Sequence, residues 1–175
     1  MRRLIIALGA AALLGFLTTT AHAGTVTAPP SASGIAYLPA PVNLQAAPSG
    51  TWVNSGLQVT LTQPGTYALD ANVHGRLWGD PPVNVVILAR LFNVTSGAVV
   101  GNSTRLVDHV VDENRGAARI AHRATASISE LITVAAPTTI RLQGTRINQN
   151  GASVLAQLLS SADAGFTSLR FQRIS

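Results

Sequence analysis

The sequence predicts an all-β fold of antiparallel strands. From residue 51 onward, about eight or nine short apolar segments follow one another between turn residues. Residues 66–78 alternate apolar and polar side chains with a period of two, which is typical of a strand with one buried face. No long segment has the period of a helix. These observations favour a β-sandwich or a barrel, and strand spacing does not by itself distinguish an immunoglobulin-like from a jelly-roll topology.

The other strands follow from the same pattern. Residues 83–94 are apolar on both faces, which predicts a strand in the middle of a sheet. Residues 63–65 and 148–151 are predicted hairpin turns, because proline presets φ and glycine accepts positive φ. Residues 112–123 are predicted to be a charged surface loop with at most one helical turn. The expected strands are residues 57–61, 66–78, 83–94, 98–99, 105–111, 124–134, 138–147, 154–159 and 166–174.

Strand 66–78 has two chemically different faces. The core face is predicted to carry Tyr67, Leu69 and Val73. The other face is predicted to contact solvent or another subunit, and its members are Asp70, Asn72, His74 and Arg76.

The N-terminus has the pattern of a secretory signal peptide. Arg2 and Arg3 supply a positive start, residues 4–17 are apolar, and residues 21–23 (Ala-His-Ala) form a small-residue cleavage site. The apolar run is shorter than the roughly 20 residues that span a bilayer, and a retained anchor is the alternative. We therefore predict a signal peptide at residues 1–23, and a secreted mature chain that is not held in a membrane.

The mature chain is predicted to consist of a linker and one domain. Residues 24–50 contain five of the nine prolines and almost no charge, which predicts a Pro/Ala-rich N-terminal segment or linker with a short first strand at residues 35–38. Residues 51–175 are expected to form the β-sandwich domain. Because the chain has no Cys, its stability must come from the core or from subunit association.

The charge balance argues against nucleic-acid binding. The chain has no lysine, and removing Arg2 and Arg3 with the signal leaves ten arginines against seven acidic residues, a net charge of +3. A modest, dispersed positive charge favours solubility and gives no nucleic-acid footprint. The exclusive use of arginine, with abundant Ala, Gly, Val and Thr, is typical of a GC-rich bacterial genome.

Three arginines suggest a ligand site. Arg115, Arg119 and Arg123 recur every four residues, and the planar guanidinium suits an anionic cell-wall polymer or polysaccharide. Trp78 is a candidate platform for stacking a sugar, and Trp52 and Tyr37 are the other aromatic candidates outside the expected core. The alternative is that these arginines are ordinary solvated surface charges.

No motif of catalysis or metal binding is present. The mature histidines are His74, His109 and His122, and none of them has the spacing of a metal-binding motif. The sequence also lacks a Gly-x-Ser-x-Gly elbow for a nucleophilic serine. We therefore predict that the protein is not an enzyme and has no catalytic residues.

Two groups of charged residues have alternative interpretations. Asp108, Asp112 and Glu113 offer the oxygen ligands that Ca²⁺ prefers, but they lack EF-hand spacing, so we predict no cofactor and keep calcium as the alternative. Arg90 and Glu130 each lie within an apolar strand, and we expect a β-bulge to turn each charge outward. The alternative is an ion pair between them, inside the domain or between subunits.

The strands of residues 51–175 resemble a known family. The segments TLTQPGTYALDANVHGRL, VILARLFNVTSGAVVGNS, SISELITVAAPTTIRLQGTR and GFTSLRFQRIS are similar to the jelly-roll domains of the C1q and tumour-necrosis-factor type, which also occur in bacterial secreted proteins and phage tail fibres. The matching features are the Pro-Gly-Thr-Tyr entry to a long strand, Arg90 and Asn93 in an apolar strand, and the pair Gly165-Phe166. The chain has no Gly-X-Y stalk, and the calcium ligands of the family do not map onto it.

The resemblance implies a two-sheet jelly roll that usually assembles as a homotrimer and acts in recognition or architecture rather than in catalysis. We therefore predict a secreted bacterial binding or structural module that works through homotrimer assembly and loop-mediated recognition. A monomeric carbohydrate-binding or cell-envelope-binding module is the first alternative. A secreted hydrolase is the second, and it requires a histidine within hydrogen-bonding reach of a serine or carboxylate in a cleft.

Overall fold

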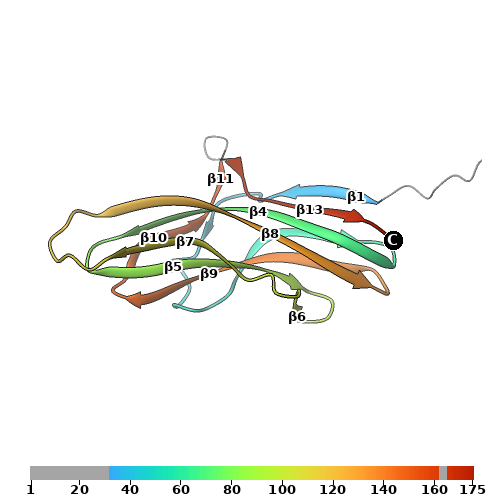
Figure 1. Cartoon of the computed structure of the whole chain (residues 1–175), viewed down its shortest axis with the longest axis horizontal. Helices are drawn as coiled ribbons and strands as arrows, with labels where there is room; N and C mark the ends of the chain where they lie inside the picture. Colours follow the sequence, from blue (N-terminus) through green and yellow to red (C-terminus); the bar gives the residue numbers. More distant parts are fainter. Residues whose placement is uncertain (1–31, 162–164) are drawn as a thin grey trace, which may run out of the picture. The chain divides into compact units, whose positions relative to one another are not determined.

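The computed structural model describes residues 32–161 and 165–175, which form two antiparallel sheets packed face to face (Figure 1). The predicted signal peptide lies outside the described residues. In sheet A, hydrogen-bonded neighbours follow the order β1 (Ser33–Tyr37), β13 (Ser168–Arg173), β4 (Gly65–Gly79), β10 (Ser153–Leu158) and β2 (Val42–Asn43). β13 and β10 share one edge of β4, and β8 (Ile120–Val134) pairs with its other edge. Sheet B contains β3 (Val53–Leu61), β9 (Thr138–Asn150), β5 (Val83–Asn93) and β6 (Ala98–Val99), with β7 (Arg105–Asp112) also paired to β5. A small ribbon contains β11 (Ser160–Ser161) and β12 (Gly165–Phe166).

The strand pairs are nested as in a jelly roll. The first long pairing joins β1 to β13, and within it β3 pairs with β9, β4 with β8, and β5 with β7. Successive pairs alternate between sheets A and B, which is the arrangement of one long hairpin rolled into a sandwich. The predicted all-β antiparallel sandwich of jelly-roll type is confirmed. Within these ranges, no helix is long and apolar enough to cross a membrane.

Strand β4 is the centre of sheet A and has the predicted alternation. Its apolar set, including Tyr67, Leu69 and Val73, is fully buried against sheet B. Burying each such side chain contributes about 1.5–3 kcal/mol. One edge of β4 pairs with β8 along its whole length, and the other edge is shared by β13 and β10. The polar set of β4 therefore lies on the outer face of sheet A.

Strand β5 is a central strand of sheet B, as predicted. Its Arg90 contacts Trp52 and Gln143 on the outer face of that sheet. The guanidinium of Arg90 lies 3.9 Å from the ring centroid of Trp52, and its Nε donates to Gln143 Oε1 at 2.9 Å. Glu130 instead pairs with Arg105, with 3.3 Å between Oε1 and Nη2. The alternative of an Arg90–Glu130 ion pair inside the domain is wrong, because Arg90 lies on the outer face of sheet B and Glu130 lies on β8, in sheet A.

Both predicted hairpin turns join strands of different sheets. Residues 63–65 connect β3 in sheet B to β4 in sheet A, and residues 148–151 lie between β9 in sheet B and β10 in sheet A. Gly151 has the predicted positive φ, at 66°. The hairpin prediction is wrong because turn residues fix a chain reversal and do not determine which strands form hydrogen bonds afterwards.

The short first strand expected at residues 35–38 is present as β1, whereas β2 and the start of β8 lie in segments expected to be irregular. β1 and β2 belong to sheet A, and Leu38 and Leu44 beside them are buried in the core. β8 begins at Ile120, so Arg123 lies in a strand, whereas the sequence predicted a loop. The pairing of β8 with β4 explains this extension, because every residue of β4 up to Gly79 has a partner on β8.

The open edge of the sandwich between β7 and β8 is closed by polar pairs. A bulge at Val107 shifts the pairing of β7 with β5, so that Val107 and Asp108 both point inward. Gly75 on β4 leaves room for them, since a Cβ there would lie 2.9 Å from Val107 Cγ1. The buried Asp108 Oδ1 lies 2.6 Å from His122 Nδ1 on β8, and Asp108 Oδ2 has no hydrogen-bond partner. A buried carboxylate thus joins the edges of the two sheets.

Replacing the histidine of this pair should destabilise the fold strongly. In His122→Ala, the buried Asp108 carboxylate loses its side-chain partner, so we expect the free energy of unfolding to fall by about 3 kcal/mol in urea denaturation. The double variant His122→Ala/Asp108→Ala should lose less than the sum of the two single variants, because the buried charge is removed as well. As a control, Arg105→Ala breaks the Arg105–Glu130 pair, whose carboxylate is less deeply buried than that of Asp108, and should cost about 1 kcal/mol or less. A loss below 1 kcal/mol for His122→Ala would contradict this role.

Candidate functional site

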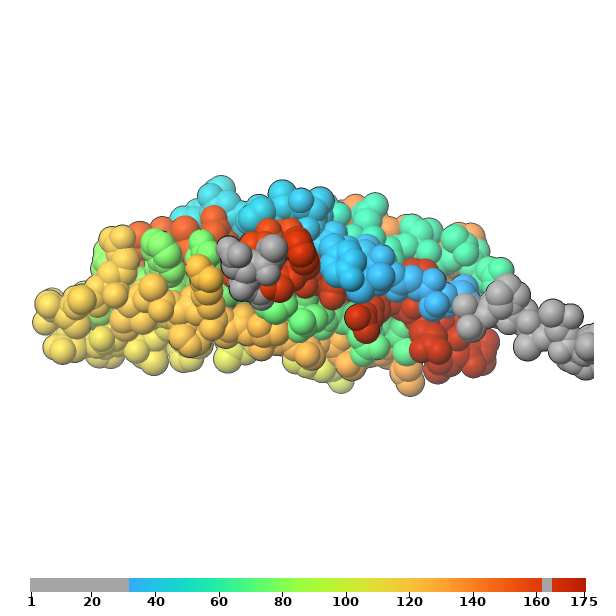
Figure 2. Space-filling view, turned by 90° about the horizontal axis from the view of Figure 1, so that it is seen from above, coloured from blue at the N-terminus to red at the C-terminus, as the bar shows by residue number. Residues whose placement is uncertain are grey.

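The outer face of sheet A is considered first, and in Figure 2 its strands β1 (blue) and β13 (red) lie at the surface. The register of β4 with β8 places Asp70 opposite Ser129, Asn72 opposite Ser127, and Arg76 opposite Arg123. On the other side of β4, Asp70 lies opposite Arg170 of β13, which in turn lies opposite Ile35 of β1. Side chains from four strands therefore meet on one surface.

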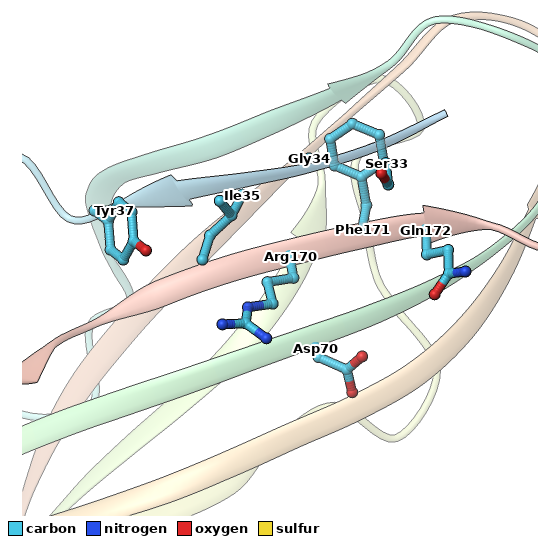
Figure 3. Close-up of a pocket in the computed structure, with 8 residues that line it drawn as sticks. All are labelled: Ser33, Gly34, Ile35, Tyr37, Asp70, Arg170, Phe171 and Gln172. Carbon is cyan, nitrogen blue, oxygen red and sulfur yellow. The ribbon is translucent and has the colours of Figure 1, made fainter. Parts of the chain in front are cut away.

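Three adjoining hollows on this surface meet at Asp70. The first is lined by residues of β1, β13 and β4, the second extends toward β8, and the third lies between β4 and β8. Asp70 Oδ1 accepts a hydrogen bond of 2.7 Å from Ser129 Oγ. Arg170 lies between Ile35 and Asp70 in Figure 3 and forms no ion pair with any carboxylate of the described residues. A carboxylate and a guanidinium are thus both accessible in the first hollow.

An exposed aromatic pair stands at the rim of this hollow. Tyr37 and Phe166 make an edge-to-face contact with ring centroids 6.0 Å apart, and they are 55% and 46% exposed. Tyr37 borders the Asp70 hollow on one side (Figure 3) and an apolar hollow on its other side, which is also lined by Leu38, Pro39 and Phe166. Sequence reasoning named Tyr37 but placed Phe166 in the last core strand. The short ribbon of β11 and β12 holds Phe166 outside the core, and no sequence signal indicated that ribbon.

The structure separates the predicted arginine stripe. Arg115 and Arg119 lie in the loop before β8, and Arg123 lies within β8. Arg119 is engaged by Asp80, with 2.7 Å between Nε and Oδ1 and 3.0 Å between Nη2 and Oδ2. These hydrogen bonds lower the pKa of Asp80 and raise that of Arg119. A ligand-binding role for Arg115, Arg119, Arg123 and Trp78 stays a prediction.

Arg123 and Trp78 nevertheless lie beside Arg76, an arginine outside the predicted every-fourth-residue repeat. Arg123 lies directly opposite Arg76, and Trp78 is the next outward-facing residue after Arg76 on β4. The alternation of residues 66–78 already placed Arg76 on the outer face, but sequence alone did not show which strand would lie beside it.

The three carboxylates that the sequence offered as calcium ligands each have a different hydrogen-bond partner. Asp108 is buried against His122, Asp112 Oδ1 accepts from the backbone N–H of Asn114 at 2.7 Å, and Glu113 Oε2 accepts from Asn150 Nδ2 at 2.9 Å. Across the described residues, no three His, Cys, Asp or Glu side chains are grouped so as to hold a metal ion. The geometry gives no support to calcium binding here.

The three histidines have structural partners. His74 Nδ1 lies 2.9 Å from Thr125 Oγ1, and His109 Nε2 lies 3.0 Å from Asn84 Oδ1. His122 reaches the carboxylate of Asp108, but no serine hydroxyl of the described chain hydrogen-bonds to it. The His122–Asp108 pair meets the expected histidine–carboxylate contact, and without a hydroxyl beside it the pair does not make up the triad of a serine hydrolase.

Comparisons with known proteins find alignments only to solved structures, at low sequence identity. No protein-family model matches the chain, and no curated protein matches it. Among solved structures, the VP2 subviral particle of infectious bursal disease virus aligns with a TM-score of 0.49 and 11% identity, covering 82% of this chain and 33% of the viral one. Eiger TNF from S. frugiperda aligns with a TM-score of 0.35 and 8% identity, covering 82% and 85% of the two chains. This chain therefore spans about a third of the length of the viral protein.

The position of His74 on the outer face gives a pH prediction. Burial lowers the pKa of His74, and the ring is covered in part by Gly165, where a Cβ would lie 3.1 Å from Cε1. As the pH falls, His74 is protonated in the unfolded chain at a higher pH than in the folded chain. The stability that neutral His74 contributes is therefore present above about pH 6.5 and is lost as the pH falls through the folded pKa. We expect an NMR titration to give a pKa for His74 below that of an unstructured reference peptide. A value at or above the reference would contradict the burial.

Proposed function

We propose that this chain is a secreted bacterial, non-catalytic carbohydrate-binding module whose binding surface is the outer face of sheet A. The observation that carries the proposal is the exposed pair Tyr37 and Phe166 beside a hollow that contains Asp70 and Arg170. Aromatic rings offer a flat apolar surface with a polar tip, which suits the apolar face of a pyranose. The signal-peptide pattern at residues 1–23 supports a site outside the cytoplasm.

The polar groups of the hollow match the chemistry of sugar hydroxyls. Asp70 offers acceptors, Arg170 offers donors in a planar fork, and the amide of Gln172 offers both. Arg170 has no carboxylate partner in the described structure, so its donors are free to bind a ligand. A few oriented polar groups beside an apolar wall are typical of small-molecule sites.

The absence of a catalytic arrangement in the described residues favours binding without turnover. The buried Asp108–His122 pair has no hydroxyl nucleophile beside it, and the hydroxyl partner of His74, Thr125, lies on an exposed strand face. Recognition by surface complementarity needs neither group to react.

Removing the ring of Tyr37 should weaken carbohydrate binding. We expect residues 24–175 to bind at least one member of a panel of soluble polysaccharides, and Tyr37→Ala to lower its affinity about tenfold, as measured by isothermal titration calorimetry. Tyr37 is more than half exposed, so its loss should leave the unfolding free energy within about 0.5 kcal/mol. Val111→Ala, which removes a similarly exposed side chain on sheet B, is the matched control. Failure of the whole panel to bind, or equal affinity for Tyr37→Ala, would refute the proposal.

A homotrimeric module with loop-mediated recognition is the second candidate function. Within the described chain, the backbone of β8 pairs only with that of β4, and β7 reaches the other edge of β8 through side chains alone. Leu131 on this strand is 65% exposed, and an unpaired edge with apolar side chains is a template for association. The resemblance to C1q-type domains also implies a trimer.

The mass of the mature chain separates the two candidates. Light scattering after size-exclusion chromatography of residues 24–175 should give three times the chain mass if the module is a homotrimer. A single chain mass would exclude trimer assembly and leave the monomeric carbohydrate-binding module.

A further inference from the structure

The end of the outer face formed by Arg76, Arg123 and Trp78 has the properties of an anion subsite. We propose that it binds the carboxylate of an acidic polysaccharide, so that the ligand class is a uronate-containing polymer. This inference rests on the proposed carbohydrate-binding function, and it names the substrate class for the same face. Arg76 on β4 and Arg123 on β8 are direct partners in the register, and Trp78 follows Arg76 as the next outward residue.

The two arginines are an uncompensated like-charge pair. Residues directly opposite each other in an antiparallel pair have Cβ atoms about 4.5–5.5 Å apart, and like charges there are destabilising. Neither guanidinium forms a hydrogen bond to a side chain or an ion pair with any described residue, in contrast to Arg119, which is held by Asp80. An anion bound between Arg76 and Arg123 would relieve this repulsion.

The side chain of Arg76 is also incompletely satisfied. Its Nε is buried and has no hydrogen-bond acceptor. A buried donor without an acceptor costs about 1–3 kcal/mol, so a shift of the side chain toward a ligand oxygen gains a hydrogen bond that the free protein lacks. Its neighbour on β10 is Gln157, which is neutral.

Among residues 32–161 and 165–175, no acidic group on this face competes for the arginines. The adjacent outward residue on β4 is His74, whose ring is paired with Thr125. Asp70 lies six residues away along β4, roughly 20 Å at the rise of a strand. Asp80 follows the end of β4 and is occupied by Arg119. The local field is therefore positive, and it is screened by solvent salt only.

Trp78 makes a sugar acid a better fit than a free inorganic anion. The indole is half-buried and lies on the same face as the two guanidinium groups, so a pyranose ring could pack on it while its carboxylate meets an arginine fork. Strand geometry puts Arg76 roughly 17 Å from Tyr37, four residues along the sheet and two strands across. A polymer can contact both places at once, whereas one monosaccharide cannot.

The test compares an oligogalacturonate with the same oligomer after reduction of its carboxyl groups. The full chain 24–175 should bind the acidic oligomer about tenfold more tightly than the reduced one in calorimetry, and salt should shrink that difference. Arg76→Gln/Arg123→Gln should abolish the preference, so that the acidic and the reduced oligomer bind with equal affinity. Replacing the half-buried Arg76 can disturb folding, so Arg123→Gln alone, at an exposed position of the edge strand, is included as a second variant. Arg141→Gln on sheet B is the matched control for loss of one charge.

The affinities for the two oligomers test the anion subsite separately from the carbohydrate-binding function. Equal affinity for the two oligomers, or a preference that survives in both arginine variants, overturns the subsite while the carbohydrate-binding function stands. If neither oligomer binds, inorganic sulfate is the remaining probe. Sulfate-induced shifts of the Arg76 and Arg123 Nε–H signals would support an anion site and reject the uronate ligand. The absence of such shifts would reject the anion site as well, and the polysaccharide panel alone decides the carbohydrate-binding function.

Discussion

The pairing of β4 with β8 is the constraint on which the rest of sheet A depends. All fifteen residues of β4 have a partner on β8, so the register fixes which side chains meet on each face. A slip of one residue would turn the buried Tyr67 and Leu69 toward solvent, which makes that register costly to change. The same register that packs the core therefore places Asp70 beside Ser129 and Arg76 beside Arg123 on the outside. Core packing and surface chemistry are set by one interaction.

The edge of the sandwich shows how the two sheets are held where strand hydrogen bonds are missing. β7 and β8 belong to different sheets, and Asp108 and Arg105 on β7 reach His122 and Glu130 on β8. The bulge at Val107 and the missing side chain of Gly75 make room for the buried carboxylate. This edge is therefore closed by polar side chains in place of strand hydrogen bonds.

Sequence reasoning succeeded where the information is local. The alternation of residues 66–78 and the apolar run of residues 83–94 predicted the two central strands. A strand buried on one face alternates apolar and polar residues, and a strand buried on both faces is apolar throughout, so neighbouring residues alone indicate the burial. It failed where pairing is long-range: turn residues at 63–65 and 148–151 indicated hairpins, yet both segments connect the two sheets. The site combines Tyr37 with Phe166, from opposite ends of the described chain, and no local pattern could have joined them. The arginine repeat suggested a helical spacing, whereas the strand partner of Arg123 is Arg76.

The most direct test of this account is a footprint of the bound polysaccharide on the folded chain. Amide chemical shifts of residues 24–175, recorded with and without an oligosaccharide that binds, would locate the contact surface residue by residue. The account predicts perturbations on β1, β4, β8 and β13, at outward positions such as Tyr37, Asp70 and Arg76, with sheet B unchanged. Perturbations confined to sheet B or to the loop that contains Arg115 would contradict it.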